Sequence, residues 1–401
     1  MSAACRVFSV LILSTCLFGH VSAAAPQSAA DQPYSLFGTQ AAVVGRGGIH
    51  TRMVGHKAVL LNADKTEVVG EAIASPSEDF EAAADLTTRT ITVRKMEWYG
   101  RWGRLRDHWQ MKGYFELLGL ADDGEHLVAG ARGVYPLPLD FHKNQVMISF
   151  FETRRLVGQV RLDQLIRDFS KLEKVPLGYR WGRYLGLNRA GYFVVETVEG
   201  NKIPFDVRTG RAVTFETDKK ASPPDWKVYQ DIMRCYEFRY PAGYTLEERL
   251  GYQGTVAGET VLKSAGTHGT ISTQAEDQHR DSAKVSFEEF AIESAKPMFQ
   301  ADGPDGSTYA DAVVGKKASR NCHGLEVLQF SLSIVRETFD EEGKETIAEK
   351  TTTEPIYAVS ISQPTDQRHQ ALFFQFEPES ASLEGEKQLI EKIVDTVNIL
   401  K

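Results

Sequence analysis

The 401-residue sequence lacks several features that would place it in a common class of protein. It has no excess of positive charge, because 46 Lys and Arg residues stand against 54 Asp and Glu residues, a formal net charge of −8. Nucleic acids and anionic membranes attract basic proteins, so this balance argues against both as partners. After the first 23 residues, no apolar run approaches the length of about 20 residues that a membrane-spanning helix needs. We therefore expect no transmembrane segment in the mature chain.

Recognised catalytic and cofactor motifs are also missing. The sequence contains no G-x-S-x-G, G-x-x-x-x-G-K-[ST], G-x-G-x-x-G or H-E-x-x-H pattern. The common hydrolase, phosphate-loop, dinucleotide-binding and zincin classes thus lose their sequence support. We predict no catalytic residue, no metal site and no cofactor, and we favour a protein that is not an enzyme.

The start of the chain is typical of a secretory signal peptide, assigned to residues 1–23. Arg6 precedes the apolar stretch Val7–Gly19, and Val21-Ser22-Ala23 forms a small-residue cleavage site. We expect export to the periplasm or the extracellular space. Leu13-Ser14-Thr15-Cys16 resembles a bacterial lipoprotein box, but threonine is a poor residue before the modified cysteine, so lipid anchoring is the less favoured alternative.

Cysteine is scarce, with four residues in the whole chain. Cys5 and Cys16 would leave with the signal peptide, which retains only Cys235 and Cys322. An even pair in an oxidising compartment predicts one disulfide between these two residues. Two unpaired thiols are the alternative.

Two segments without hydrophobic periodicity divide the rest of the chain. Residues 24–33 are small, polar and flanked by proline, as expected for a flexible tether. Residues 216–225 contain consecutive prolines, which do not occur inside a helix or a central strand. We place a linker there, between a β-rich domain over residues 34–215 and an α+β domain over residues 226–401.

The predicted N-terminal domain contains a degenerate repeat. Leu118-Gly119-Leu120 is followed by Gly124, and Leu185-Gly186-Leu187 is followed by Gly191 at the same spacing. Each copy predicts a strand, a tight turn and a second strand, because glycine supplies the positive φ that such turns need.

The repeated segments, residues 117–133 and 184–211, resemble β-propeller blades. The tetrapeptide Arg-Trp-Gly-Arg also occurs twice, at residues 101–104 and 180–183. A closed propeller needs at least four blades of about 40–45 residues, and the N-terminal segment barely holds four. A β-sandwich or an open stack of blade-like sheets fits the spacing equally well.

The pattern changes after the linker. The predicted strand at Phe238-Arg239-Tyr240-Pro241 is followed by a capping box at Ser286-Phe287-Glu288-Glu289, which predicts the start of a helix. Phe373-Phe374-Gln375-Phe376 predicts another strand, and apolar residues at helical spacing over 389–397 predict a closing helix. This order over residues 227–401 resembles the PsbP-like α-β-α sandwich domain, and the resemblance implies a non-enzymatic accessory or assembly role.

One segment, residues 94–115, is unusually rich in aromatic and basic residues. Trp, Tyr and Arg dominate the centres of protein interfaces, so the segment is a candidate recognition surface. The alternative is structural, with the tryptophans filling a sheet core and the arginines lying over them. The candidate binding residues are Trp98, Tyr99, Arg101, Trp102, Arg104 and Trp109.

Together these observations favour an exported, non-catalytic binding or assembly protein of the cell envelope or extracellular space, with a protein as its partner. Two alternatives stay open. One is a hydrolase that acts on cell-wall or extracellular carbohydrate, which would need a deep pocket with convergent carboxylates. The other is a module that binds a small ligand or a metal ion.

Overall fold

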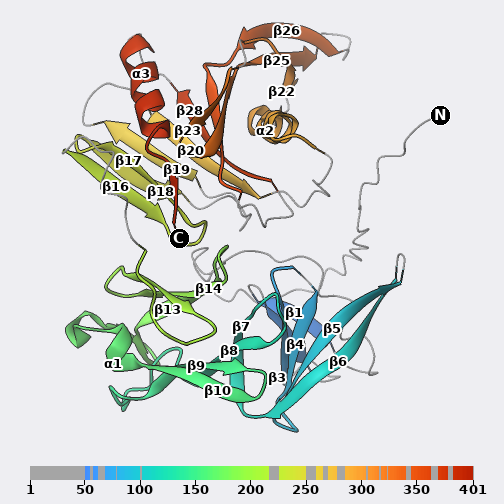
Figure 1. Ribbon diagram of the computed structural model, residues 1–401, viewed down its shortest axis with the longest axis vertical. Coiled ribbons are helices and arrows are strands. Elements are labelled where there is room, and N and C mark those ends of the chain that lie inside the picture. Colours follow the sequence, from blue (N-terminus) through green and yellow to red (C-terminus); the bar gives the residue numbers. More distant parts are fainter. Residues whose placement is uncertain are drawn as a thin grey trace. The chain divides into compact units, whose positions relative to one another are not determined.

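The protein is described by a computed structural model, shown in Figure 1. The structure describes residues 50–54, 57–61, 68–77, 79–99, 102–215, 225–249, 259–264, 270–277, 285–303, 306–315, 318–322, 324–339, 345–362, 369–377 and 383–400. These residues all belong to one compact unit that spans 32–401. The predicted signal peptide and tether, and all of the linker except Asp225, lie outside the described residues.

The described chain is mainly β-structure in antiparallel sheets, with short helices. The first sheet is a six-stranded meander in which each strand pairs with the next along the chain. Its strands are β1 (His50–Val54), β2 (Lys57–Leu61), β3 (Val68–Ala74), β4 (Phe80–Asp85), β5 (Thr90–Tyr99) and β6 (Trp102–Lys112).

Two further meanders follow. The second sheet has the order β10-β9-β8-β7 and the third has the order β13-β14-β15. Their strands are β7 (Phe115–Leu120), β8 (His126–Ala131), β9 (Val146–Glu152), β10 (Arg155–Arg161), β13 (Gly182–Leu187), β14 (Tyr192–Thr197) and β15 (Lys202–Asp206). Between them lie α1 (Leu162–Leu165), η2 (Phe169–Lys171) and the hairpin of β11 (Glu173–Val175) and β12 (Gly178–Arg180).

The two Leu-Gly-Leu segments both form hairpins, although Gly186 has a φ of +92° and Gly119 does not have a positive φ. In β7 and in β13 the strand register shifts at the residue before the glycine, as in a β-bulge. Gly124 and Gly191 then occupy the following turns at φ values of +69° and +81°. The sequence prediction of strand, glycine turn and strand is therefore confirmed at both positions.

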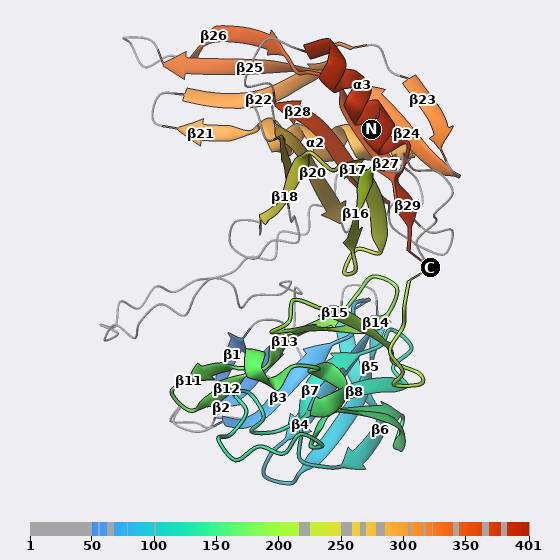
Figure 2. The same cartoon turned by 90° about the vertical axis from the view of Figure 1, so that its left-hand side faces the viewer.

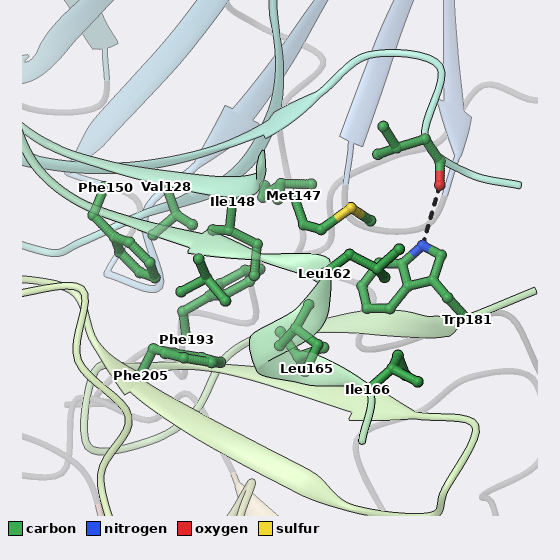
Figure 3. Packing of buried hydrophobic residues seen from close by; sticks show 14 of the residues in the cluster. Val128, Met147, Ile148, Phe150, Leu162, Leu165, Ile166, Trp181, Phe193 and Phe205 are labelled. Carbon is green, nitrogen blue, oxygen red and sulfur yellow. Dashed lines mark hydrogen bonds between the residues drawn. The ribbon is translucent and has the colours of Figure 1, made fainter. Parts of the chain in front are cut away.

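The second sheet is buried on both faces because successive residues of its strands alternate between two cores. Leu117, Leu127 and Ala129 pack in one cluster with the first sheet, including Ile91 and Val93. The other face contributes to a second cluster that includes the third sheet and α1, shown in Figure 3. Labelled members of the second cluster are Val128, Met147, Ile148, Phe150, Leu162, Leu165, Ile166, Trp181, Phe193 and Phe205.

Three sheets follow the predicted linker. β16 (Trp226–Asp231), β17 (Tyr236–Pro241) and β29 (Asn398–Ile399) form a three-stranded sheet. A seven-stranded sheet has the order β18-β19-β20-β28-β27-β24-β23. Its strands are β18 (Tyr244–Arg249), β19 (Glu259–Ser264), β20 (Thr270–Asp277), β23 (Ala318–Cys322), β24 (Leu325–Phe330), β27 (Ile356–Ser360) and β28 (Gln370–Glu377).

The last sheet has four strands in the order β21-β22-β25-β26, which lie side by side in Figure 2. They are β21 (Ala301–Gly303), β22 (Gly306–Val313), β25 (Leu332–Phe339) and β26 (Glu345–Thr352). The helices of this part are α2 (Phe287–Ala295), the single-turn η6 (Lys296–Phe299) and α3 (Leu383–Val394).

The seven-stranded sheet is covered on both faces. Tyr357 and Phe374 point into a cluster with α3 and β17, whereas Ala358 and Phe373 point into a cluster with α2. Figure 1 accordingly shows α3 and α2 on opposite sides of this sheet. This layered arrangement follows from the two-residue period of a strand, which sends neighbouring apolar side chains to opposite faces.

Both predicted helix signals are confirmed. The hydroxyl of Ser286 accepts a hydrogen bond from the Glu289 backbone N–H at 3.2 Å, and α2 begins at the next residue, Phe287. In α3, Ile390, Ile393 and Val394 are buried together against the seven-stranded sheet. Local capping and periodicity therefore fixed these two elements.

The predicted disulfide is not formed in the structure, where both thiols are free. Cys235 is buried in a small cluster with Phe215 and Leu400. Cys322 lies at the end of β23, where its thiol donates to the backbone oxygen of Asp395 at 3.5 Å. Burial raises the pKa of Cys235 to about 11 and also raises the pKa of Cys322.

Candidate functional site

The predicted recognition surface falls on the hairpin of β5 and β6. Its register pairs Trp98 with Gly103 and Tyr99 with Trp102, so these aromatic positions follow one another at the end of the hairpin. The side chains of Trp98, Tyr99, Trp102 and Arg104 lie outside the described residues, as does the whole of Arg101. Recognition by this end of the hairpin stays a prediction.

Trp109, further along β6, is part of the hydrophobic core. It is buried with Val93 and Leu120, and its indole N–H donates to the backbone oxygen of Gly124 at 2.7 Å. A buried indole needs such a partner, and here it fixes the turn between β7 and β8. At this position the structure supports the structural alternative.

The second copy of the repeated tetrapeptide has a related role. Trp181 is fully buried and contacts Tyr184 edge to face, with ring centroids 5.3 Å apart. Its indole N–H donates to the backbone oxygen of Val134 at 3.1 Å, the dashed line in Figure 3. Trp181 therefore anchors the segment that follows Val134 to the protein core.

The anchored segment is held to the β11–β12 hairpin by main-chain hydrogen bonds. Leu137 and Tyr179 each donate a backbone N–H to the other's backbone oxygen, both at 2.9 Å. Gly178 lies beside this bridge at a φ of +153°, and a Cβ at this position would come within 1.7 Å of the Leu137 oxygen. Only glycine fits there, because any side chain would force the two segments apart.

Aromatic contacts of Phe141 also stabilise the segment that follows Val134. Phe141 stacks on Phe169 with centroids 6.2 Å apart and meets Tyr179 edge to face at 5.7 Å. Lys143 lies over the Phe169 ring, with its Nζ 4.6 Å from the centroid. Ring pairs and cation–π contacts of this kind each add a fraction of a kcal/mol to a few kcal/mol. The segment is thus a well-supported platform.

Large apolar side chains face solvent on this platform. Leu177 is 80% exposed, Leu139 is 64% exposed and Tyr135 is 47% exposed. Leu139 follows the bridged residue Leu137 by two positions, and Leu177 precedes the bridged residue Tyr179 by two positions. We call these three residues the Leu139–Leu177 patch. Exposed apolar side chains on a rigid support are available for contact with a partner.

The region around the patch is locally basic. Residues 161–183 contain six basic and three acidic residues, whereas the whole chain has a formal net charge of −8. Lys171 and Lys174 in this region are exposed. Arg180 is paired with Glu173 at 3.1 Å. Residues 161–183 therefore carry an excess of basic residues, of which Arg161, Arg180 and Arg183 are each paired with a carboxylate.

The sequence analysis missed the patch. Its local signal is a leucine beside proline in two separate places, Pro138-Leu139 and Pro176-Leu177. Proline restricts both turns, but nothing in either short stretch shows that the two turns meet. The contact depends on the bridge between Leu137 and Tyr179, which joins residues 42 positions apart and is a property of the fold.

Polar side chains gather at another turn, between β7 and β8. His108 Nε2 lies 2.8 Å from Glu125 Oε1, and Thr153 donates to Glu125 Oε2 at 2.6 Å. Burial alone would raise the pKa of Asp123, but hydrogen bonds from the backbone N–H groups of Glu125 and His126 and from the His126 ring hold it below its usual range. Nowhere in the described ranges do three or more His, Cys, Asp or Glu residues form a group that could hold a metal ion.

No helix in the described ranges is long and apolar enough to cross a lipid bilayer.

Comparisons with known proteins give weak similarity only. No protein-family model matches the chain, and no curated protein matches it. Among solved structures, cyanobacterial PsbP from Synechocystis sp. PCC 6803 is 11% identical with a TM-score of 0.29, covering 46% of this chain and 98% of that one. Kuenenia stuttgartiensis hydrazine synthase is 10% identical with a TM-score of 0.21, covering 70% of this chain and 71% of that one. A protein from Lactobacillus plantarum is 9% identical with a TM-score of 0.23, covering 82% and 98%.

Proposed function

We propose that this chain is an exported, non-catalytic binding or assembly protein of the cell envelope or extracellular space, and that its partner is a protein. The Leu139–Leu177 patch carries the proposal. Leu177 and Leu139 expose most of their side chains on a surface that the core holds in place. Burial of each leucine in a partner would contribute about 1–2 kcal/mol, given the usual transfer free energy and their exposed fractions.

Because the patch is rigidly supported, the free energy gained by burying its leucines can contribute to binding. Trp181, the Leu137–Tyr179 bridge and the stacked Phe141 and Phe169 rings order the patch before any partner arrives. Association then costs little additional conformational entropy at the contact. The fit is to a partner with an apolar pocket whose rim is acidic, because the surrounding segment carries an excess of basic residues.

We also propose a division of the fold into two domains, a β-rich domain over 34–215 and an α-β-α sandwich domain of PsbP-like type over 226–401. The four larger apolar clusters support this division, whereas two small clusters, one of them around Cys235, join residues from both sides of the linker. The first and second clusters described above contain residues before the linker, and the clusters on the two faces of the seven-stranded sheet contain residues after it.

The test is affinity capture with the protein as bait in an extract of its own cell envelope. The variant is the double substitution Leu139→Ser and Leu177→Ser, and the control is Val314→Ser, which changes a residue that is 51% exposed on another part of the chain. We expect the double variant to lose at least tenfold in affinity for the captured protein, measured with that protein purified, while the control keeps the wild-type affinity.

Exposed positions tolerate serine, so both variants should keep the wild-type melting temperature. Equal capture by the double variant would refute the patch as the binding site. Failure of the wild-type protein to capture any partner under gentle conditions would count against a protein partner altogether.

A further inference from the structure

A groove beside α1 shares no lining residue with the Leu139–Leu177 patch. It has a volume of about 350 Å³ and lies between β10, α1 and the end of β15. Its lining residues are Gly158, Gln159, Val160, Gln164, Ile203, Phe205, Thr209, Gly210, Arg211 and Ala212. Small-molecule sites in proteins begin at about this size.

The groove has a fixed shape because two glycines meet beside it. A Cβ at Gly158 would come within 2.7 Å of the Thr209 oxygen, and a Cβ at Gly210 would come within 2.9 Å of the Gly158 Cα. The turn that carries Thr209 and Gly210 is closed by Asp206, whose carboxylate accepts from Arg208 N–H at 2.9 Å and from the Thr209 hydroxyl at 3.0 Å. The strand and the turn therefore pack in direct backbone contact.

The lining contains hydrogen-bonding groups that have no partner among the described residues. Gln164 accepts a hydrogen bond from the Arg161 N–H through its amide oxygen, which leaves its NH₂ group. Gln159 donates its NH₂ group to Ser149, which leaves its amide oxygen. The guanidinium of Arg211 has no hydrogen bond or ion pair with any residue in the described ranges.

Charge and apolar surface define the complementary ligand. Arg211 is the one charged residue among those that line the groove, and no carboxylate lines it. The absence of an acidic residue from this lining removes the groove as the paired-carboxylate site of a glycosidase. Ile203 is half-buried and supplies apolar surface, which suits the C–H face of a sugar ring, whereas Val160 and Phe205 are almost fully buried in the core beneath it.

We propose that the groove binds a small hydroxylated carboxylate of the uronic acid type. The guanidinium of Arg211 would hold the carboxylate in a charge-assisted pair, which is the strongest class of hydrogen bond available to it. Gln159 and Gln164 would accept from and donate to the ring hydroxyls. The protein thereby gains a ligand site that does not depend on the protein partner proposed above.

Glucuronate and glucose are the probes, because they differ by a carboxylate on the same ring. Binding of each to the full chain is measured by calorimetry at low salt. We expect glucuronate to bind at least tenfold more tightly than glucose. Arg211→Gln should remove this difference, whereas Arg208→Gln, in the same turn but outside the lining, should change glucuronate affinity by less than twofold.

A second variant locates the bound ligand. Ala212 lines the groove and is exposed, so Ala212→Trp should fill the groove without disturbing the core and abolish binding of both probes. The proposal is overturned if glucuronate does not bind, if glucose binds equally well, or if Ala212→Trp still binds glucuronate. An equal loss in the Arg208 and Arg211 variants would also overturn it, because it would indicate diffuse electrostatic attraction.

Discussion

Glu81 gives the sharpest test of the packing between the strands of the first sheet. It lies on β4 opposite Arg94 of β5, and its side chain is only 5% exposed. Arg94 Nη1 is 3.6 Å from Glu81 Oε1, which has no hydrogen-bond partner in the described residues. The same guanidinium donates to Asp107 at 3.2 Å. Burial therefore outweighs the attraction of Arg94 and raises the pKa of Glu81 to about 7.

The sign of the pH dependence follows from this shift. Below pH 4.5, the ordinary value for glutamate, Glu81 is protonated in both the folded and the unfolded protein. Between pH 4.5 and about 7 the folded protein retains a proton that the unfolded chain has released, so stability falls as the pH rises. Each pKa unit is worth about 1.4 kcal/mol, so the fall contributed by Glu81 is about 3 kcal/mol.

Urea unfolding at pH values from 4.5 to 8.5, followed by tryptophan fluorescence, measures this contribution. Other groups titrate in the same range, so the decisive quantity is the stability difference between wild type and Glu81→Gln at each pH. We expect this difference to shift in favour of the variant by about 3 kcal/mol between pH 4.5 and about 8 and then to stay constant.

Asp107→Asn is the matched control, because Asp107 contacts the same guanidinium but has a side chain that is 61% exposed. Its stability difference from wild type should vary by less than about 1 kcal/mol over the same range, as for exposed ion pairs in general. A stability difference between wild type and Glu81→Gln that is independent of pH would show that Glu81 is not buried as described.

Two other predictions test backbone packing and thiol state. Gly210→Ala should lower the free energy of unfolding, measured in urea, by about 2 kcal/mol or more, because Gly210 has a positive φ and contacts Gly158. The control is Gly133→Ala, where the φ is +78° but no atom lies within 4 Å of the added Cβ. This control should lower the free energy of unfolding by about 1 kcal/mol. Equal losses would refute the close contact. In peptide mapping without reductant, both cysteines should carry the label of an alkylating reagent added after unfolding, and in the native protein Cys322 should react before the buried Cys235. Recovery of a Cys235–Cys322 disulfide would instead restore the sequence prediction.

Much of the local structure could be predicted from the sequence because it depends on short-range signals. The capping box at Ser286 located the start of α2, and the apolar spacing over 389–397 located α3 and the buried residue Val397 after it. The glycines that follow the two Leu-Gly-Leu segments predicted the hairpin turns at Gly124 and Gly191. In each case the residues that decide the conformation lie within one turn or one hairpin.

Burial of charge could not be predicted in the same way. Glu81 sits in an alternating strand whose apolar residues, Phe80 and Ala82, face the other side. The sequence therefore indicates an exposed glutamate at this position. Only the neighbouring strands and Arg94 make it buried, and these are set by a register that extends over several hairpins.

The second copy of the repeated tetrapeptide shows that a tryptophan in a conspicuous motif can have a positioning role. Trp181 ends in the core and donates to Val134, which orders the platform that presents Leu139 and Leu177. The tryptophan is thus a positioning residue for the patch and does not itself belong to it. The sequence analysis followed the aromatic residues of 94–115, whereas the patch consists of Tyr135 and two leucines that each follow a proline. Recognition surfaces of this kind become visible only once tertiary contacts show which apolar side chains the core has left outside.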